Sequence, residues 1–225
     1  MPYIARTHQL KQSLLYHIYN RGLNREKIFN QPQDFSYFIN LLVEYAKRYN
    51  FKIYHWVIMS NHYHILTELE RPEIMSSVMS GIARAYSCYH HREHKTAGYL
   101  WQGRFKSQPI EKESYLLACG RYIERNPVKA SLVMHAWEYE YSSARFYVSG
   151  YSDGLTTHSP FFETFSNTPE GRQQAYKEYL QAYDKEEDSY FENLEFPRGS
   201  AEFLKRLYKE KGHYLPRKQG RIAKD

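Results

Sequence analysis

The sequence predicts an α+β fold in which a four-stranded, mainly antiparallel sheet packs against helices, followed by a C-terminal extension. Strand-like runs alternate with segments of helical periodicity in the order β-α-β-β-α-β-α. A length of 225 residues with 42% hydrophobic content suits one folded domain and an appendage. The composition then changes beyond about residue 148, where loop-like and charge-rich segments begin.

The first half of the domain contains one strand, one helix and a hairpin. Residues 13–20 are rich in apolar and aromatic types and end at a glycine turn, which indicates the first strand. Residues 32–49 place apolar side chains at helical spacing behind an initial proline. Residues 51–59 and 62–69 are β-rich runs separated by a two-residue polar turn, which predicts a hairpin.

The second half completes the sheet. A helical pattern begins at Pro72 and ends near Gly98, and residues 104–110 are predicted to form the fourth strand. A third helix over 114–126 ends where Pro127 biases its predecessor out of the helical region. This order is that of the ferredoxin-like fold with one added helix. We expect the helices to cover one face of the sheet and to leave the other face free.

The C-terminal extension consists of segments with opposite charge. Residues 149–154 are loop-like, and 170–183 are a short amphipathic helix candidate. Residues 184–196 hold six acids against one lysine, whereas 201–225 hold eight bases against three acids. We therefore expect an acidic linker and a basic tail, and we divide the chain into a catalytic domain at 1–148 and an extension at 149–225.

Charge and aromatic content leave two interpretations open. The net charge is +6 and the chain has 23 tyrosines, so it could contact phosphates and stack on bases. Alternatively, the tyrosines line a half-buried sheet.

Cys88 and Cys119 lie too far apart in sequence for a CxxC pair, which excludes a zinc-thiolate site and a disulfide framework. Neither a membrane-spanning run nor an apolar leader is present, so we expect a cytoplasmic protein without a membrane partner.

Two short motifs carry candidate chemistry. His62 and His64 stand two apart on a predicted strand, so both rings project from one face with Cα atoms about 6.6 Å apart and could chelate a cation. Tyr122 and Asn126 are four apart, so a phenol and an amide share one helical face. The alternative is that the histidines are polar strand positions, that Tyr122 packs and that Asn126 caps the helix.

Together the two motifs suit phosphoryl transfer. Asn126 could complete a three-ligand divalent site with the histidines, while Tyr122 acts as nucleophile. Tyr115 lies seven residues earlier on the same helical face and is the second candidate nucleophile. A phosphotyrosine ester stores the energy of the cleaved bond, so a 3′ hydroxyl can later attack it and join strands without ATP.

Around these residues the sequence resembles the single-tyrosine HUH transposases of the IS200-like family, most closely the REP-associated tyrosine transposases. The matching segments are Tyr-His-Ile-Tyr-Asn-Arg-Gly (16–22), Met-Ser-Asn-His-Tyr-His (59–64), Leu-Trp-Gln-Gly-Arg-Phe-Lys-Ser (100–107), Arg-Tyr-Ile-Glu-Arg-Asn-Pro-Val-Lys-Ala (121–130) and Tyr-Ser-Ser (141–143). Their order and spacing extend over about 130 residues. Ser60 departs from the family pattern, which has proline before Asn-His.

The resemblance implies a metal-dependent endonuclease and strand transferase for DNA transposition and recombination. His62 and His64 would be the metal ligands, Tyr122 the nucleophile, and Asn126 the position where many relatives have a glutamine. The implied cofactor is Mg²⁺ or Mn²⁺, and the implied partner is single-stranded DNA with REP-type hairpins, attached through a 5′-phosphotyrosine. Relatives include dimers and monomers, so the resemblance leaves the oligomeric state open. For a DNA-binding protein of the cytoplasm, we expect association with the nucleoid.

DNA-binding candidates lie in or beside these segments and in the tail. Trp101 and Phe105 are candidate stacking platforms, and their alternative is a place in the core. The candidate phosphate contacts are Arg21, Arg25, Arg84, Arg104, Lys106, Arg125, Arg217, Lys218 and Arg221.

Two rival functions are weighed against strand transfer. A ferredoxin-like sheet also forms non-catalytic nucleic-acid-binding domains, but the aromatic signatures of RNA-recognition domains are absent from the first and third strands. A metal-dependent hydrolase that uses water would be expected to carry further carboxylate or histidine ligands. Covalent retention of DNA on Tyr122 distinguishes the three.

Overall fold

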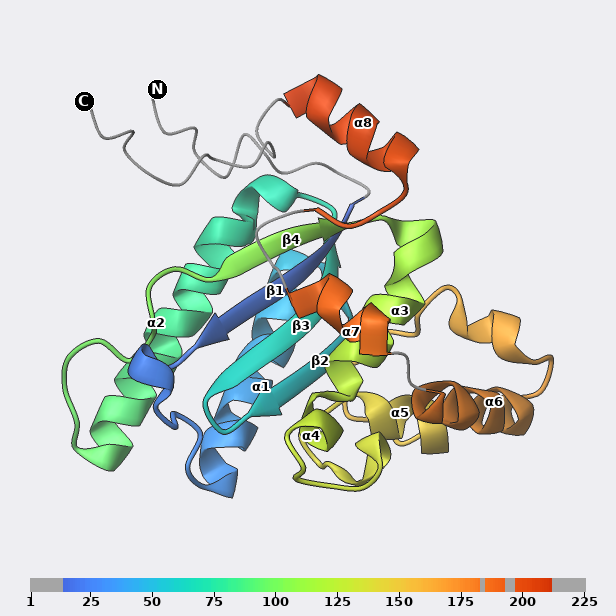
Figure 1. The fold of residues 1–225 in the computed structure, drawn as a ribbon. Helices are drawn as coiled ribbons and strands as arrows, with labels where there is room; N and C mark the ends of the chain where they lie inside the picture. The colour runs from blue at the N-terminus through green and yellow to red at the C-terminus, as the bar shows by residue number, and fades with distance from the viewer. Residues whose placement is uncertain (1–13, 183–184, 193–196, 212–225) are drawn as a thin grey trace, which may run out of the picture.

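The computed structural model describes residues 14–182, 185–192 and 197–211, and its centre is a four-stranded antiparallel sheet (Figure 1). The strand order is β2-β3-β1-β4, which with the two crossover helices is the ferredoxin-like arrangement predicted from the sequence. The elements of this unit are β1 (Leu15–Arg21), α1 (Pro32–Tyr49), β2 (Phe51–Met59), β3 (His62–Leu69), α2 (Met75–His94), β4 (Lys106–Ile110), α3 (Lys112–Glu124) and α4 (Asn126–Lys129).

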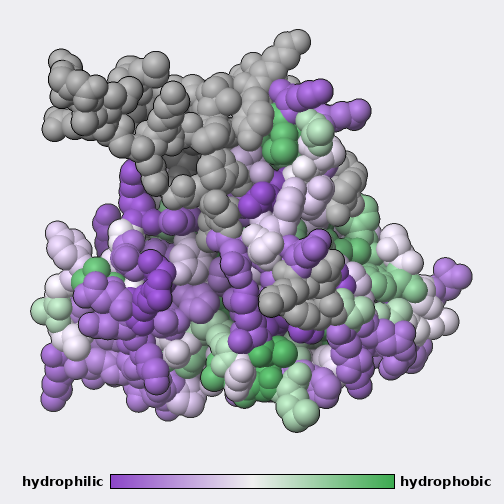
Figure 2. Space-filling model, in the orientation of Figure 1, coloured by the Kyte–Doolittle hydropathy of each residue, from purple (hydrophilic) through white to green (hydrophobic). Residues whose placement is uncertain are grey.

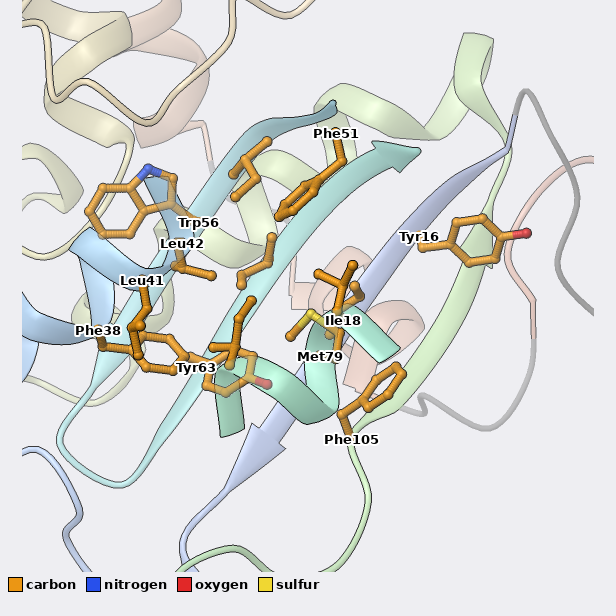
Figure 3. Close-up of a cluster of buried hydrophobic side chains, with 14 of the residues drawn as sticks. Tyr16, Ile18, Phe38, Leu41, Leu42, Phe51, Trp56, Tyr63, Met79 and Phe105 are labelled. Carbon is orange, nitrogen blue, oxygen red and sulfur yellow. The ribbon is translucent and has the colours of Figure 1, made fainter. Parts of the chain in front are cut away.

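Helices α1 and α2 cover what we call the first face of the sheet (Figure 1). Alternate β1 residues, Tyr16 and Ile18, point into this core, where they join Phe38 of α1 and Met79 of α2 (Figure 3). Burying one such side chain contributes about 1.5–3 kcal/mol. Phe105 also packs here, and it is only 7% exposed.

The start of α1 is fixed by a buried carboxylate. Asp34 accepts hydrogen bonds from the backbone N–H groups of Asn30 (2.8 Å) and Gln31 (3.1 Å), the two residues that precede the helix. The same carboxylate accepts hydrogen bonds from Tyr89 and His94 of α2. Asp34 therefore holds the two helices together as well as starting one of them.

The second face of the sheet, formed by the side chains that point away from α1 and α2, is also covered. Leu15, Val57 and Leu66 make this face apolar, and α3 packs on them with Leu116 and Ile123. The expectation of a free face is therefore wrong, because strands with apolar side chains on both faces must be buried on both.

The boundary of α3 differs from the predicted 114–126. The helix ends at Glu124, and α4 begins at Asn126 with Pro127 in its first turn, where proline costs no hydrogen bond. The proline therefore starts a new helical turn instead of ending the helical segment.

The extension forms helices that pack back on the domain. It contributes α6 (Pro169–Gln181), α7 (Lys185–Glu192) and α8 (Ala201–Lys211), and α6 packs with α5 (Ala144–Ser149) around Tyr147 and Tyr176. The segment expected to be an acidic linker contains α7, because fully buried Phe191 anchors it on the second face. No helix among the described residues is long and apolar enough to cross a membrane.

Candidate active site

The site lies on the second face, where strand register brings the two predicted histidines beside β1. His64 pairs with Tyr19 and His62 pairs with Arg21. The two imidazole rings are 5.2 Å apart between centroids and nearly perpendicular, at 87°. The prediction that both rings project from one face is confirmed, because both border the same cavity.

This cavity has a volume of about 480 Å³ and gathers side chains from β1, β3, β4, α3, α4, α7 and the loop before β4. Three of the candidate phosphate contacts reach it, namely Arg21, Arg104 and Lys106. The complete lining is Tyr19, Asn20, Arg21, His62, His64, Gln102, Arg104, Lys106, Tyr122, Asn126, Lys129 and Glu192. Figure 2 shows that the face of the molecule in this view is mostly hydrophilic.

Tyr122 and Asn126 border the same cavity as His62 and His64, because α3 and α4 pack on the second face. The Tyr122 ring lies edge-on to His64, with the centroids 5.8 Å apart, and packs on Phe191 of α7 at 5.7 Å. The amide nitrogen of Asn126 donates to the backbone carbonyls of Tyr122 (2.9 Å) and Ile123 (3.2 Å). The amide oxygen of Asn126 is thus the atom that remains for a ligand in the cavity.

Outer hydrogen bonds hold one nitrogen of each histidine. Asn61 donates its amide N–H to the carbonyl of Arg25, so its amide oxygen accepts from His62 Nδ1 at 2.5 Å. His64 Nδ1 lies 2.8 Å from Nε2 of His17, a fully buried ring on β1. The other nitrogen of each ring, Nε2, takes no part in these hydrogen bonds, and an outer hydrogen bond on one nitrogen is the usual arrangement of metal-binding imidazoles.

Burial keeps these histidines neutral. It lowers the pKa of His17 and of His62 to about 4, with the positive charge of Arg21 adding to the effect on His62. Burial also lowers the pKa of His64 well below its usual value, and the neighbouring His17 and His62 add to the effect. A neutral imidazole is the form that binds a metal ion.

The donor set suits a divalent cation with few protein ligands. His62 and His64 could supply two nitrogens, and Asn126, which borders the same cavity, could supply an amide oxygen. Within the described ranges, no three His, Cys, Asp or Glu side chains are placed to hold a metal ion. The amide oxygen of Asn126 is one candidate third ligand, since Asn126 borders the cavity together with both histidines.

The charged surroundings of Tyr122 were not predicted from the sequence. Burial raises the pKa of the Tyr122 phenol well above its usual range, and the negative charges of Glu192 and Asp188 act in the same direction. Lys129 places its ammonium nitrogen 5.9 Å from the centroid of the Tyr122 ring. The same ammonium forms ion pairs with Asp188, at 3.4 Å, and with Glu192. The acidic helix α7 is therefore part of the site.

The structure adds side chains to the site that were not predicted from the sequence, among them His17, Lys129 and Glu192. His17 stands two residues before Tyr19 on the same face of β1, and this strand periodicity was the available signal. Lys129 follows Asn126 by three residues, a helical spacing that could have placed it beside the site. No local signal marked Glu192, because tertiary contacts of α7, among them the packing of Phe191, bring it to the cavity.

Several predicted residues lie elsewhere. Tyr115 stacks on Tyr190 at 5.5 Å and is not part of the cavity lining. Arg84 borders a separate hollow beside Tyr45, and Arg125 donates to the carbonyl of Leu180, which ties α6 to the end of α3.

The two aromatic DNA-binding candidates pack in or against the core, which was the alternative to a role as stacking platforms. Trp101 packs with Phe29 and Tyr63 and donates its indole N–H to the carbonyl of Ala83, while Phe105 is buried. Arg25 contributes its backbone carbonyl to the orientation of Asn61, as described above. The tail candidates Arg217, Lys218 and Arg221 lie outside the described residues.

Comparison with known proteins finds a matching family model and a similar solved structure. The family model described as "Transposase IS200 like" matches residues 10–126, just over half of the chain. A solved structure described as a REP-associated tyrosine transposase bound to a REP hairpin is similar, with a TM-score of 0.55 and 18% sequence identity. The similarity covers 71% of this chain and 96% of that chain. No curated protein was found to match. The chain therefore belongs to the family of IS200-like transposases.

Proposed function

We propose that this transposase cleaves and rejoins single-stranded DNA at hairpin sequences through a 5′-phosphotyrosine on Tyr122. The observation that carries the proposal is the shared cavity, in which a buried tyrosine lies beside His62, His64 and Asn126. A similar solved structure is described as bound to a REP hairpin, which supports hairpin DNA as the partner.

The reaction balances without a further reactant. The Tyr122 oxygen attacks the scissile phosphorus, a new phosphorus–oxygen bond forms, and the bond from phosphorus to the 3′ oxygen breaks. The proton that leaves the phenol is balanced by the proton that the departing 3′ oxygen takes up. The energy of the phosphoester is kept, so a second 3′ hydroxyl can attack the phosphotyrosine and join two strands.

Each site residue has a task that follows from its place. His62, His64 and Asn126 would hold Mg²⁺ or Mn²⁺, which when bound polarises a phosphoryl oxygen. Burial keeps the Tyr122 phenol protonated at neutral pH, so attack requires that its proton be removed and its charge be balanced. The ammonium of Lys129 lies 5.9 Å from the centroid of the Tyr122 ring, so in this proposal it adds positive charge beside the reacting phosphate.

The two parts of the chain have different tasks in this proposal. Residues 1–148 are the catalytic domain, which carries the nucleophile and the candidate metal ligands. Residues 149–225 are the extension, whose helix α7 contributes Glu192 to the cavity wall. Arg21, Arg104 and Lys106 border the cavity and would contact the phosphates of the bound strand.

The test is covalent capture of DNA by the full chain. Labelled single-stranded DNA with a REP-type hairpin is incubated with Mn²⁺, and the products are resolved on a denaturing gel and mapped by peptide mass analysis. We expect an adduct on Tyr122 that Tyr122→Phe abolishes and that the matched variant Tyr115→Phe retains. An adduct on Tyr115 would overturn the assignment of the nucleophile.

The same experiment distinguishes the rival functions. Tight binding of the hairpin without any adduct would indicate a non-catalytic binding domain. Cleavage to free ends without a protein adduct would indicate a hydrolase that uses water as nucleophile. Either outcome would refute the proposed strand transfer.

A further inference from the structure

We propose that His17 is a positioning residue that fixes the tautomer of His64, so that Nε2 of His64 faces the cavity as a lone pair. This inference rests on the proposed metal-dependent function and assigns a task to a residue outside the cavity lining. The observation that carries it is a line of three buried polar side chains, Gln108, His17 and His64, which leads from β4 across β1 to β3.

Strand register creates this line. His17 pairs with Gln108 of β4, while Tyr19, two residues further along β1, pairs with His64 of β3. All three polar side chains point to the second face, and each is at most 3% exposed. Buried polar atoms need hydrogen-bond partners, and these side chains supply such partners to one another.

The direction of the hydrogen bonds follows from the chemistry of each group. The oxygen of the Gln108 amide can only accept, and it lies 3.4 Å from Nδ1 of His17, which therefore carries the proton. A neutral imidazole has one N–H, so Nε2 of His17 is a lone pair. This lone pair, 2.8 Å away, accepts from Nδ1–H of His64, and Nε2 of His64 is left without a proton.

The other candidate ligand has the same arrangement through different residues. The Asn61 oxygen accepts from Nδ1 of His62, which leaves Nε2 of that ring as the lone pair. Both histidines thus present the same nitrogen, although one depends on a neighbouring amide and the other on a second imidazole. Outer hydrogen bonds of this kind typically change metal affinity by about 10–100-fold when they are removed.

A structural role alone would give different results. The His17 ring also packs edge-on against Tyr122 at 5.8 Å, so its removal could disturb the nucleophile by packing only. The variant His17→Phe keeps a ring of similar size but has no acceptor. The variant His17→Gln loses the ring but keeps an amide oxygen that can accept from Nδ1–H of His64.

The first measurement is the affinity for Mn²⁺ alone, by titration calorimetry of the full chain without DNA. We expect His17→Phe to raise the Kd for Mn²⁺ about 10–100-fold and His17→Gln to stay within about threefold of wild type. If packing were the only role, Phe would be tolerated and Gln would not, and that result would overturn the inference.

The second measurement needs no substitution at His17. The ¹⁵N shifts of the His64 ring in the metal-free wild type report its tautomer, and we expect the Nδ1–H form. An Nε2–H form in the wild type would overturn the inference even if every variant failed to fold.

The outcomes separate this inference from the proposed function. A wild-type protein that binds no Mn²⁺ and forms no DNA adduct would refute both. A wild-type protein that binds Mn²⁺ and forms the Tyr122 adduct, while His17→Phe binds Mn²⁺ equally well, would refute the role of His17 only.

Discussion

Mild acid should destabilise the metal-free protein, because the buried histidines of the site are neutral when folded and protonated when unfolded. The pKa of His17 is about 4 in the folded protein, against 6.5 for an exposed histidine. The unfolded chain therefore binds more protons below pH 6.5, and the stabilisation present at neutral pH is lost as the pH falls toward 4.

The size of the effect follows from the same two values. At pH 5 an unfolded histidine is largely protonated, while His17 in the folded protein is about nine-tenths neutral. The difference corresponds to a loss of about 2 kcal/mol relative to neutral pH for this one residue. The pKa of His62 is lowered to a similar value, so it adds to the loss.

Urea unfolding in EDTA, followed by tryptophan fluorescence at pH 7 and pH 5, measures this loss. We expect His17→Gln, which cannot titrate, to reduce the difference between the two pH values by about 2 kcal/mol. The exposed residue His158 provides the matched control, and His158→Gln should leave the difference unchanged. If His17→Gln showed the same pH dependence as wild type, the reasoning from burial would be wrong.

Three further predictions follow from contacts around the site. Lys129→Met should slow formation of the Tyr122 adduct by about 100-fold, since removal of one charge-stabilising donor typically costs 10²–10³-fold in rate. Glu192→Gln should retain the adduct, and equal losses for the two variants in quantitative adduct gels would assign Lys129 to packing only. Glu124→Gln should lower the free energy of unfolding by about 1–3 kcal/mol, because this buried carboxylate accepts hydrogen bonds from His55, Ser143 and Tyr176. An unchanged midpoint of urea unfolding would contradict the prediction. Gly120→Ala should also destabilise the fold, by about 1–3 kcal/mol in urea unfolding, since an added Cβ would lie 2.7 Å from the His55 ring. A midpoint equal to that of the wild type would show that the ring moves away freely.

The elements with strong local patterns were predicted closely from the sequence. The bounds predicted for α1, β2 and β3 match the structure, because helical periodicity, β-rich runs and turn residues act over a few positions. The spacing of His62 and His64 also determined their common face. These features depend on neighbours in the chain, which is why the sequence was sufficient for them.

Tertiary packing decided the rest of the site. The sequence placed Tyr122 and Asn126 on one helical segment, but only the packing of α3 on the second face put them opposite the histidines. His17 and His64 are 47 positions apart, and their hydrogen bond depends on the register of β1 against β3. The acidic segment had the composition of a solvated linker, yet buried Phe191 and the ion pairs to Lys129 hold it against the site as α7. Local patterns carry no information on such long-range contacts, since these form only when separate elements bury their apolar faces together.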